Sequence, residues 1–352
     1  MKTSTKLFCL LTTGFACFSM NVEAQSDKNQ KNISSDPVAE NMLAYQRSVG
    51  GWPKAVGKVV VNYDKVLSEN ERIAIKADSL RSDATIDNKA TSKEIRYLIK
   101  AYKAKQDPRY LAAVEKGIDY LLEAQYENGG WSQYYPDHSS YRGEITYNDN
   151  AMINVLNILQ DIVEGRSDFD QVSGSYKIKA EQSIQKGISC ILKTQIVVNG
   201  KLTVWCAQYD EKTMKPAKAR SFELVSLSGS ESVGITDFLM RIKKPSAEIK
   251  QAVNSAMAWF ERSKIEGYEL VSVDDPKSPT EKDKVLVAKP GSVIWARFYD
   301  IDTNEPFFCG RDGIKKKTIA EIDKERRVGY AWYGTWPAKL LDNKYPAWLK
   351  KI

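Results

Sequence analysis

The stretch LEAQYENGGWS (residues 122–132) repeats the earlier stretch LAYQRSVGGWP (residues 43–53). Two looser copies occupy residues 192–205 and 258–268. The copies follow one another at intervals of roughly 70 residues, which leaves room for two helices and their loops in each unit. Their polar anchors are Gln46, Gln125, Gln195 and Glu261. A repeat of this length predicts an all-α fold of helical hairpins, stacked or closed into a ring.

Helical periodicity indicates where the hairpins lie. It is present in residues 37–48, 92–104, 107–124, 148–164, 175–194, 230–240 and 246–263. Short strands are expected at residues 59–61, 201–204 and 284–287. In the two clear copies the glycine pair is expected to end a helix, which places the following tryptophan at the same end of each unit. No linker divides residues 37–352, which predicts a single domain.

Four long connections are the expected place for function, because loops of such length in a compact domain are usually functional. They cover residues 50–86, 129–147, 207–229 and 275–291. If the hairpins close into a ring, the ends of the units gather around one cleft.

The N-terminus is predicted to be an export signal. In residues 1–24 a basic start precedes an apolar run, and Ala24 closes a small-residue cleavage site. The run is too short to span a membrane. Residues 25–36 are polar and aperiodic, which is typical of a flexible tether. We therefore expect a secreted or periplasmic protein without membrane contact after cleavage. A lipid anchor at Cys17 fits its flanking residues poorly but stays open.

The composition of the chain limits which partners and which kinds of catalytic site are expected. The formal net charge is +7 without a dense Lys/Arg block, which argues against a nucleic-acid partner. The 18 tyrosines and 8 tryptophans of this mildly basic chain suit an acidic sugar polymer, because aromatic rings stack on pyranose faces and cations meet carboxylates. The single histidine, His138, argues against histidine-based metal or triad chemistry. A monomer is expected.

Three cysteines follow the predicted cleavage site: Cys190, Cys206 and Cys309. So few cysteines do not form a disulfide scaffold, and buried free thiols are expected. Pairing of Cys206 with Cys309 stays open.

Two matched segments carry paired acid and amide side chains. SDATIDNKAT (residues 82–91) and ITYNDNA (residues 145–151) each place a threonine, one residue, and an acid and an amide in either order before a helix. An isolated pair of this kind is typical of a helix N-cap. Two copies, one repeat apart, favour a metal site. Oxygen ligands from Asp87, Asn88 and Asp149 suit a hard cation, with Ca²⁺ favoured over Mg²⁺.

Arginines form the second candidate set. Arg220 lies in KARSFE, Arg297 in WARFYD and Arg311 in FFCGRDG, all in irregular segments beside aromatic residues or glycines. Loop arginines of this kind form bidentate clamps for carboxylates. The alternative is local pairing, for example of Arg311 with the adjacent Asp312.

Eight segments carry a family resemblance, in this order: GGWPK, TIDNKAT, QYENGGWSQYYP, ITYNDNAM, VWCAQYD, KARSFELVSLSGSES, RFYDIDTNEPFFCGRDG and ERRVGYAWYGTWP. With them the chain resembles a family 10 polysaccharide lyase, a pectate lyase, from Tyr45 to Pro337. The resemblance implies an (α/α)₃ toroid with irregular loops and short β-strands lining a cleft. It also implies Ca²⁺-dependent β-elimination on α-1,4-linked polygalacturonate, which gives 4,5-unsaturated oligogalacturonides.

The resemblance assigns roles to the metal candidates. Asp87 and Asn88 match the acid and amide that serve the metal in the family's TIDN motif, and Asp149 matches a second metal-site acid. One departure is Asn150, because the family commonly has another acid at this position. That departure puts the metal affinity in doubt.

The resemblance also assigns roles to the arginines. Arg220 matches the general base of the family, and Arg297 and Arg311 match arginines that grip substrate carboxylates. Two alternatives remain. A non-catalytic uronate-binding protein would need no paired acids. An α/α-toroid glycoside hydrolase would need two carboxylates flanking the bond and no arginine base.

Overall fold

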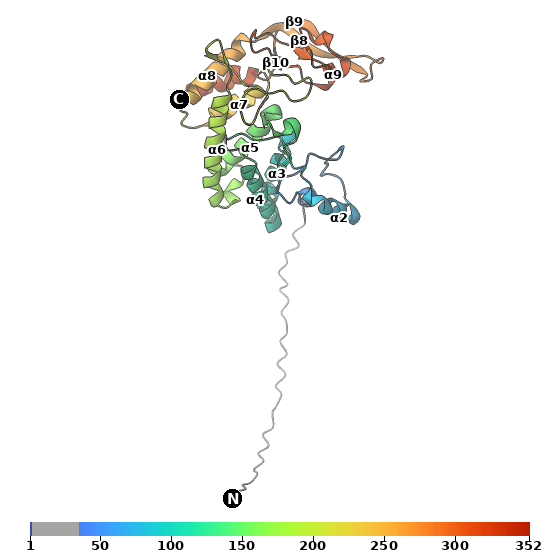
Figure 1. The fold of residues 1–352 in the computed structure, drawn as a ribbon, viewed down its shortest axis with the longest axis vertical. Coiled ribbons are helices and arrows are strands. Elements are labelled where there is room, and N and C mark those ends of the chain that lie inside the picture. The colour runs from blue at the N-terminus through green and yellow to red at the C-terminus, as the bar shows by residue number, and fades with distance from the viewer. Residues whose placement is uncertain (2–34) are drawn as a thin grey trace. The chain divides into compact units, whose positions relative to one another are not determined.

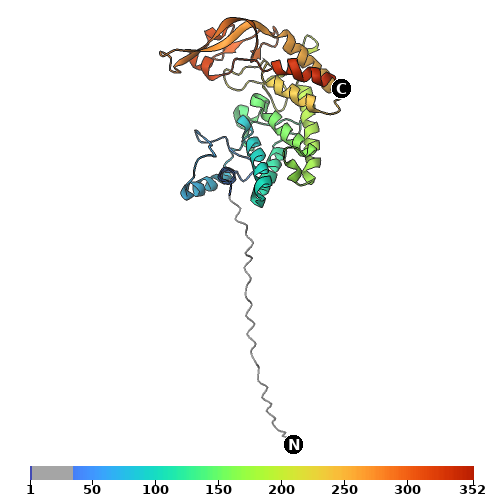
Figure 2. The same cartoon turned by 180° about the vertical axis from the view of Figure 1, so that it is seen from behind.

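Three pairs of helices follow one another in the computed structural model, which describes Met1 and residues 35–352. The pairs are α3 (Ser92–Lys105) with α4 (Pro108–Glu123), α5 (Ala151–Glu164) with α6 (Ser175–Thr194), and α7 (Glu231–Arg241) with α8 (Ala247–Arg262). The first helices contact one another in order, α3 with α5 and α5 with α7, and the second helices do the same. Figures 1 and 2 show this succession from teal through green to yellow and orange. The expected all-α class of helical hairpins is confirmed.

The chain from Ser35 onward forms one compact unit, which begins with α1 (Pro37–Tyr45). The Asp36 side chain caps α1 by accepting hydrogen bonds from the backbone N–H groups of Val38 and Ala39. Apart from Met1, the predicted signal peptide (residues 1–24) and most of the predicted tether (residues 25–36) lie outside the described residues. Within the described part of the chain, no helix has both the length and the apolar character that a membrane span requires.

One buried tryptophan closes each repeat unit. The indole Nε1 of each donates to a backbone carbonyl at the end of the preceding helix or beside it: Trp52 to Met42 (2.7 Å), Trp131 to Leu121 (2.7 Å), Trp205 to Ile191 (2.8 Å) and Trp295 to Phe260 (2.8 Å). A buried indole N–H needs such a partner. The first three tryptophans lie where the repeat predicts them. The fourth copy, expected to end at residue 268, instead closes at Trp295.

The repeated glutamine joins each unit to the next. Each Nε2 donates to its own loop and to the second helix of the following pair: Gln46 to Gly50 (2.8 Å) and Ala113 (2.9 Å), Gln125 to Gly129 (3.0 Å) and Ser183 (2.9 Å), and Gln195 to Thr203 (2.9 Å) and Ala252 (3.0 Å). Glu261, the fourth anchor, is exposed and pairs with Lys264 at 2.5 Å. In the first three copies, the repeated glutamine therefore links its unit to the next by hydrogen bonds.

The glycine pairs do not end helices, because α1 and α4 both end before them. Gly50 and Gly129 have φ angles of +102° and +91°. A Cβ atom on Gly50 would lie 2.3 Å from the Lys116 carbonyl oxygen, and one on Gly129 would lie 2.0 Å from that of Lys186. Glycine is needed here for its backbone conformation and for close approach to the next unit.

A long antiparallel ribbon replaces most of the loop expected at residues 275–291. In the ribbon, β8 (Ile265–Asp274) pairs with β9 (Lys282–Ala296), and β13 (Tyr333–Gly334) pairs with the end of β9. Figure 1 shows the ribbon in orange. The strand expected at residues 284–287 is part of β9, so its extent was underestimated.

The ribbon is the enlarged counterpart of a small hairpin in the preceding unit. There, β4 (Val197–Val198) and β5 (Lys201–Leu202) lie between α6 and Trp205. The ribbon likewise follows α8 and has Trp295 next to last in β9, so most of it separates the fourth tryptophan from its helix in sequence. This insertion explains why the fourth copy was placed wrongly.

The remaining elements are short. The strand pairs are β1 (Ala55–Val56) with β2 (Val59–Val60), β3 (Ile145–Thr146) with β6 (Gln208–Tyr209), β7 (Leu227–Ser228) with β10 (Phe298–Tyr299), and β11 (Phe308–Cys309) with β12 (Lys315–Lys316). The helices that the sequence analysis missed are α2 (Glu69–Ala77), α9 (Lys324–Gly329) and α10 (Tyr345–Leu349). α2 buries none of its residues, and a capping box of Ser68 and Glu71 marks its start.

The three cysteines are buried free thiols, as expected, and Cys206 does not pair with Cys309. Burial raises the pKa of Cys190 and of Cys309 to about 11. The Cys309 Sγ donates to the backbone carbonyl of Ser221 at 3.7 Å. These thiols therefore contribute to packing and remain protonated at neutral pH.

Gln195→Ala should lower the free energy of unfolding by about 1–3 kcal/mol, because the buried carbonyls of Thr203 and Ala252 would lose their donor. Glu261→Ala is the matched control at the fourth anchor position. Its exposed side chain should change the free energy of unfolding by less than about 0.5 kcal/mol. Urea denaturation measures both values. Equal losses of unfolding free energy in the two variants would show that the hydrogen bonds of the repeated glutamine do not stabilise the fold.

Candidate active site

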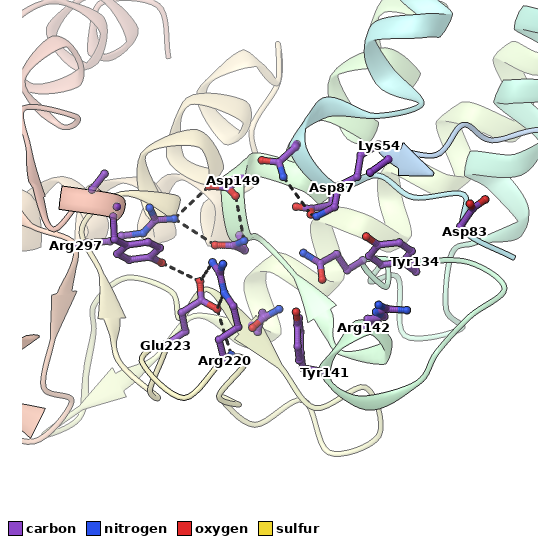
Figure 3. Close-up of a pocket in the computed structure, with 18 of the residues that line it drawn as sticks. Lys54, Asp83, Asp87, Tyr134, Tyr141, Arg142, Asp149, Arg220, Glu223 and Arg297 are labelled. Carbon is purple, nitrogen blue, oxygen red and sulfur yellow. Dashed lines mark hydrogen bonds and ion pairs between the residues drawn. The ribbon is translucent and has the colours of Figure 1, made fainter. Parts of the chain in front are cut away.

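Loops from successive repeat units line one cavity of about 630 Å³. Its charged lining residues are Lys54, Arg81, Asp83, Asp87, Arg142, Asp149, Arg220, Glu223 and Arg297. Figure 3 shows Arg220 and Arg297 at one end and Lys54 toward the other, with Asp87 and Asp149 between them. Asn88 also lines the cavity. Five of the six residues singled out in the sequence therefore meet at one place.

The same backbone hydrogen bonds position three successive loops. The N–H groups of Thr85, Thr146 and Ser228 donate to the carbonyls of Trp52 (3.1 Å), Trp131 (3.0 Å) and Trp205 (2.8 Å). The next N–H groups, of Ile86, Tyr147 and Gly229, donate to Gln133 (3.1 Å), Ala207 (2.9 Å) and Arg297 (2.9 Å). Each loop is thus held between two tryptophan segments. This register makes Asn88, Asp149 and Glu231 equivalent positions.

The two acid-amide segments form matching turns, η2 (Asp87–Lys89) and η4 (Asn148–Asn150). Asn88 has a φ angle of 49° and Asp149 one of 50°, both in the left-handed region that Asn and Asp adopt more readily than other side chains. The turns contact each other. The duplicated motif therefore brings its polar side chains to one wall of the cavity.

Asp87 is nearly fully buried, with 2% of its surface exposed. Its Oδ2 contacts the Lys54 ammonium and accepts from Asn88 Nδ2 at 3.3 Å, whereas its Oδ1 is buried without a hydrogen-bond partner. Burial alone would lower the pKa of Lys54, but the hydrogen bond and charge of Asp87 raise it. A buried carboxylate oxygen without a partner costs about 1–3 kcal/mol. A ligand atom at this position would remove that cost.

Arg220 forms a bidentate ion pair with Glu223, with Nε 2.7 Å from Oε2 and Nη2 2.5 Å from Oε1. The Tyr330 hydroxyl donates to the same Oε1 at 2.9 Å. The Arg220 guanidinium also lies over the Phe222 ring, 4.7 Å from its centroid. The hydrogen bonds with Glu223, followed by its negative charge, raise the pKa of Arg220 above its usual value.

Arg297 is buried, with 6% of its surface exposed. Its Nη2 contacts Glu231 and lies 3.2 Å from Asn148 Oδ1 and 3.3 Å from Asp149 Oδ1. The guanidinium carbon is 4.6 Å from the ring centroid of Tyr330. The Arg297 Nε is buried and donates to no protein atom. Arg297 therefore contacts turn η4 through Nη2, while its Nε has no protein partner.

Arg311 is the one candidate that does not line the cavity. Its side chain is 62% exposed and pairs with Glu325 through both Nε and Nη2 at 3.1 Å. The hydrogen bonds and charge of Glu325 raise the pKa of Arg311, and the positive charge of Arg220 opposes this rise. The loop that carries Arg311 also contacts Ser221, since Cys309 donates to the Ser221 carbonyl at 3.7 Å. Arg311 thus lies beside the Arg220 segment, outside the cavity wall.

The sequence analysis assigned no role to Lys54, Glu223 or Glu231. Lys54 and Arg297 both stand two residues after a repeat tryptophan, a shared position that the sequence displays once Trp295 is recognised as the fourth copy. Glu223 is three residues from Arg220, a spacing that allows a local ion pair. Glu231 could have been found by aligning SGSE with TIDN and TYND.

A separate acidic group lies outside the predicted metal set. Carboxylate oxygens of Glu144, Asp210 and Glu211 lie within 4.8 Å of one another. Burial, together with the charges of Asp210 and Glu211, raises the pKa of Glu144 to about 7. Asp210 Oδ1 accepts from the backbone N–H of Thr213 at 2.6 Å, so this acid also shapes its turn.

Comparisons with known proteins place this site in a family. The chain matches the model of the pectic acid lyase family over residues 46–341. Among solved structures, a family 10 polysaccharide lyase from Cellvibrio cellulosa is 35% identical, with a TM-score of 0.76 and coverage of 90% of this chain and 92% of that one. A mutant of the family 10 polysaccharide lyase from the same organism, in complex with trigalacturonic acid, is 37% identical, with a TM-score of 0.77 and coverage of 88% and 92%. The search of curated proteins gave no match.

The family match contains all six candidate residues as well as Lys54, Glu223 and Glu231. Its extent agrees with the resemblance inferred from the eight sequence segments. The structural similarity extends over 88–90% of this chain. This chain belongs to the pectic acid lyase family and is a polysaccharide lyase.

Proposed function

We propose that this lyase cleaves polygalacturonate by Ca²⁺-dependent β-elimination, with Arg220 as general base. The observation that carries the proposal is the convergence of turns η2 and η4 with Arg220 and Arg297 on one cavity. The complex of the similar Cellvibrio protein with trigalacturonic acid supports an oligogalacturonate as ligand.

The donor set of the two turns fits a calcium ion. Asp87 offers a buried oxygen without a protein partner, and Asn88 and Asp149 are exposed where they line the cavity. Two carboxylates and an amide supply the oxygen ligands that Ca²⁺ prefers. When bound, the ion would draw negative charge from a uronate carboxylate and so make the adjacent C–H group more acidic.

Substrate carboxylates are proposed to bind to arginine. The buried Nε of Arg297 lacks a partner, and a uronate carboxylate would satisfy it with a charge-assisted hydrogen bond. We assign Arg297 to the carboxylate beside η4. Arg311, exposed and next to the Arg220 segment, is assigned to a carboxylate at the rim.

Arg220 is proposed to accept the proton. β-Elimination removes the C5 proton, which is α to the uronate carboxylate, and expels the C4 glycosidic oxygen to leave a C4–C5 double bond. A guanidine nitrogen can accept that proton only in its neutral form, and an unperturbed arginine has a pKa above about 12. Glu223 raises the pKa of Arg220 further, whereas burial opposes the rise, and the positive charge of a bound cation would oppose it as well.

The arrangement of charges disfavours the two alternatives. A hydrolase needs one carboxylic acid that donates a proton. The lining acids Asp83, Asp87, Asp149 and Glu223 each lie next to a cation: Arg47, Lys54, Arg297 and Arg220. Burial raises the pKa of Glu223, but the hydrogen bond and charge of Arg220 outweigh burial and lower it, so Glu223 is a poor proton donor. A protein that only binds uronates would not need the paired turns η2 and η4.

Removal of divalent cations should abolish cleavage. In excess EDTA, polygalacturonate should give no ultraviolet absorbance from a C4–C5 double bond, and Ca²⁺ should restore it. Asp149→Asn should weaken Ca²⁺ affinity at least about 10- to 100-fold, since even outer-shell changes have this effect on metal sites. Asp168→Asn is the control, because Asp168 pairs with Lys103 away from the cavity. Full activity in EDTA would refute the metal requirement.

The pH dependence should report on Arg220. If its neutral form is the base, log kcat should rise with pH through the neutral range. Glu223→Gln removes the negative charge that raises the pKa of Arg220, so the rising limb should move to lower pH even as maximal turnover falls. Arg220→Ala should lower kcat by about two to four orders of magnitude. An unmoved limb in Glu223→Gln, or turnover of Arg220→Ala within tenfold of wild type, would remove Arg220 from this role.

Arg311→Ala should raise KM for polygalacturonate while leaving the thermal unfolding midpoint almost unchanged, because its ion pair with Glu325 is exposed. Arg311→Lys should restore binding only in part, since lysine lacks the bidentate fork. Glu325→Ala is the control that breaks the ion pair and leaves the arginine. If Arg311→Ala kept the wild-type KM, Arg311 would be a local partner of Glu325 only.

A further inference from the structure

Glu231 stands in the third of the three matched loops, where the backbone hydrogen bonds make it equivalent to Asn88 and Asp149. Those two side chains are exposed and line the cavity, whereas Glu231 is 2% exposed and is not one of the lining residues. It is also the first residue of α7, where the helix dipole favours a negative charge. The third loop thus supplies a buried anion where the other two supply cavity-lining ligands.

Both carboxylate oxygens of Glu231 are bound within the protein. Oε1 accepts from Arg297 Nη2, and Oε2 accepts from the Ser228 hydroxyl. The Ser228 oxygen in turn accepts from the Glu231 backbone N–H at 3.1 Å. Arg297 is therefore the cavity-lining side chain to which Glu231 is hydrogen-bonded.

Two carboxylates share one nitrogen of Arg297. Besides Glu231, Nη2 lies 3.3 Å from Asp149 Oδ1, while Nε has no protein partner. A buried guanidinium requires a neighbouring negative charge. Without Glu231, that requirement would draw Arg297 onto Asp149, the acid assigned to the metal.

We propose that Glu231 is a positioning residue that neutralises Arg297, keeps its contact with Asp149 long at 3.3 Å and leaves its Nε free for a uronate carboxylate. The inference rests on the proposed function, in which Arg297 binds substrate and Asp149 binds Ca²⁺. It predicts that one substitution outside the cavity lining weakens both substrate and metal binding.

Glu231→Gln tests the proposal, because it keeps the shape of the side chain and removes its charge. KM for polygalacturonate and the Ca²⁺ concentration for half-maximal activity should both rise on the order of tenfold. Glu94→Gln is the matched control: Glu94 is a fully buried glutamate on α3, bound by the Tyr63 hydroxyl at 2.8 Å and absent from the cavity lining. It should lower the thermal unfolding midpoint without changing KM or the Ca²⁺ requirement. If Glu231→Gln behaved like this control, the proposal would be overturned.

Two further variants separate positioning from general destabilisation. In an Arg297→Ala background, Glu231→Gln should change kcat/KM by less than about threefold, since residues that act as a unit are not additive. An undiminished effect there would overturn the proposal. Glu231→Asp keeps the buried charge, so folding is retained, but its shorter arm should raise KM severalfold. A wild-type KM in this variant would also overturn it.

Calorimetric titration with trigalacturonic acid separates this inference from the proposed function. If wild-type protein with Ca²⁺ forms no unsaturated product, the proposed lyase reaction is wrong. The affinities of wild type and Glu231→Gln for trigalacturonic acid still decide the role of Glu231. Affinity that is about tenfold weaker in the variant supports positioning, and equal affinity refutes it.

Discussion

The hydrogen bond from a buried indole to a backbone carbonyl of the preceding segment is the interaction on which the rest of this structure depends. It recurs at Trp52, Trp131, Trp205 and Trp295. A buried indole N–H without a hydrogen-bond partner is energetically costly. Each tryptophan therefore fixes the position of its loop relative to the helix that precedes it. The carbonyls of three of these residues then hold the next loop. Because the helices pack in a regular order, the loops that these carbonyls bind are also placed in a regular order.

The loops held in this way carry different side chains in the same backbone register. In the first two, acid and amide groups face the cavity, and in the third a buried glutamate holds an arginine. The position two residues after the tryptophan varies in parallel, with Lys54 in the first unit and Arg297 in the last. Both cations contact acids of the cavity wall. A repeated scaffold has thus acquired one asymmetric site by exchanging side chains at matching positions.

The sequence was most informative where the repeat is intact. All seven expected helices exist, and α5 begins later than expected because Asp149 and Asn150 adopt left-handed conformations. The duplicated acid-amide motif led to Asp87, Asn88 and Asp149, and the structure brings them together. Non-local contacts were harder to predict from the sequence. Nothing in the local pattern of residues 265–296 shows that β8 pairs with β9 along its whole length. Likewise, the short KARSFE segment does not reveal whether Arg220 pairs with Glu223 or with substrate. The contact of Glu231 with Arg297 joins residues whose separation hides it from local analysis.

The β8–β9 ribbon has a consequence for how such a protein can diverge. Both of its ends are pinned, one by α8 and the other by the bond from Trp295 to Phe260. The preceding unit spans the same interval with a small hairpin. The entropy needed to close a loop grows slowly with its length, so chain can be added between pinned ends at low cost. The tip of the ribbon can therefore take up additional residues while Arg297 keeps its position in the cavity wall.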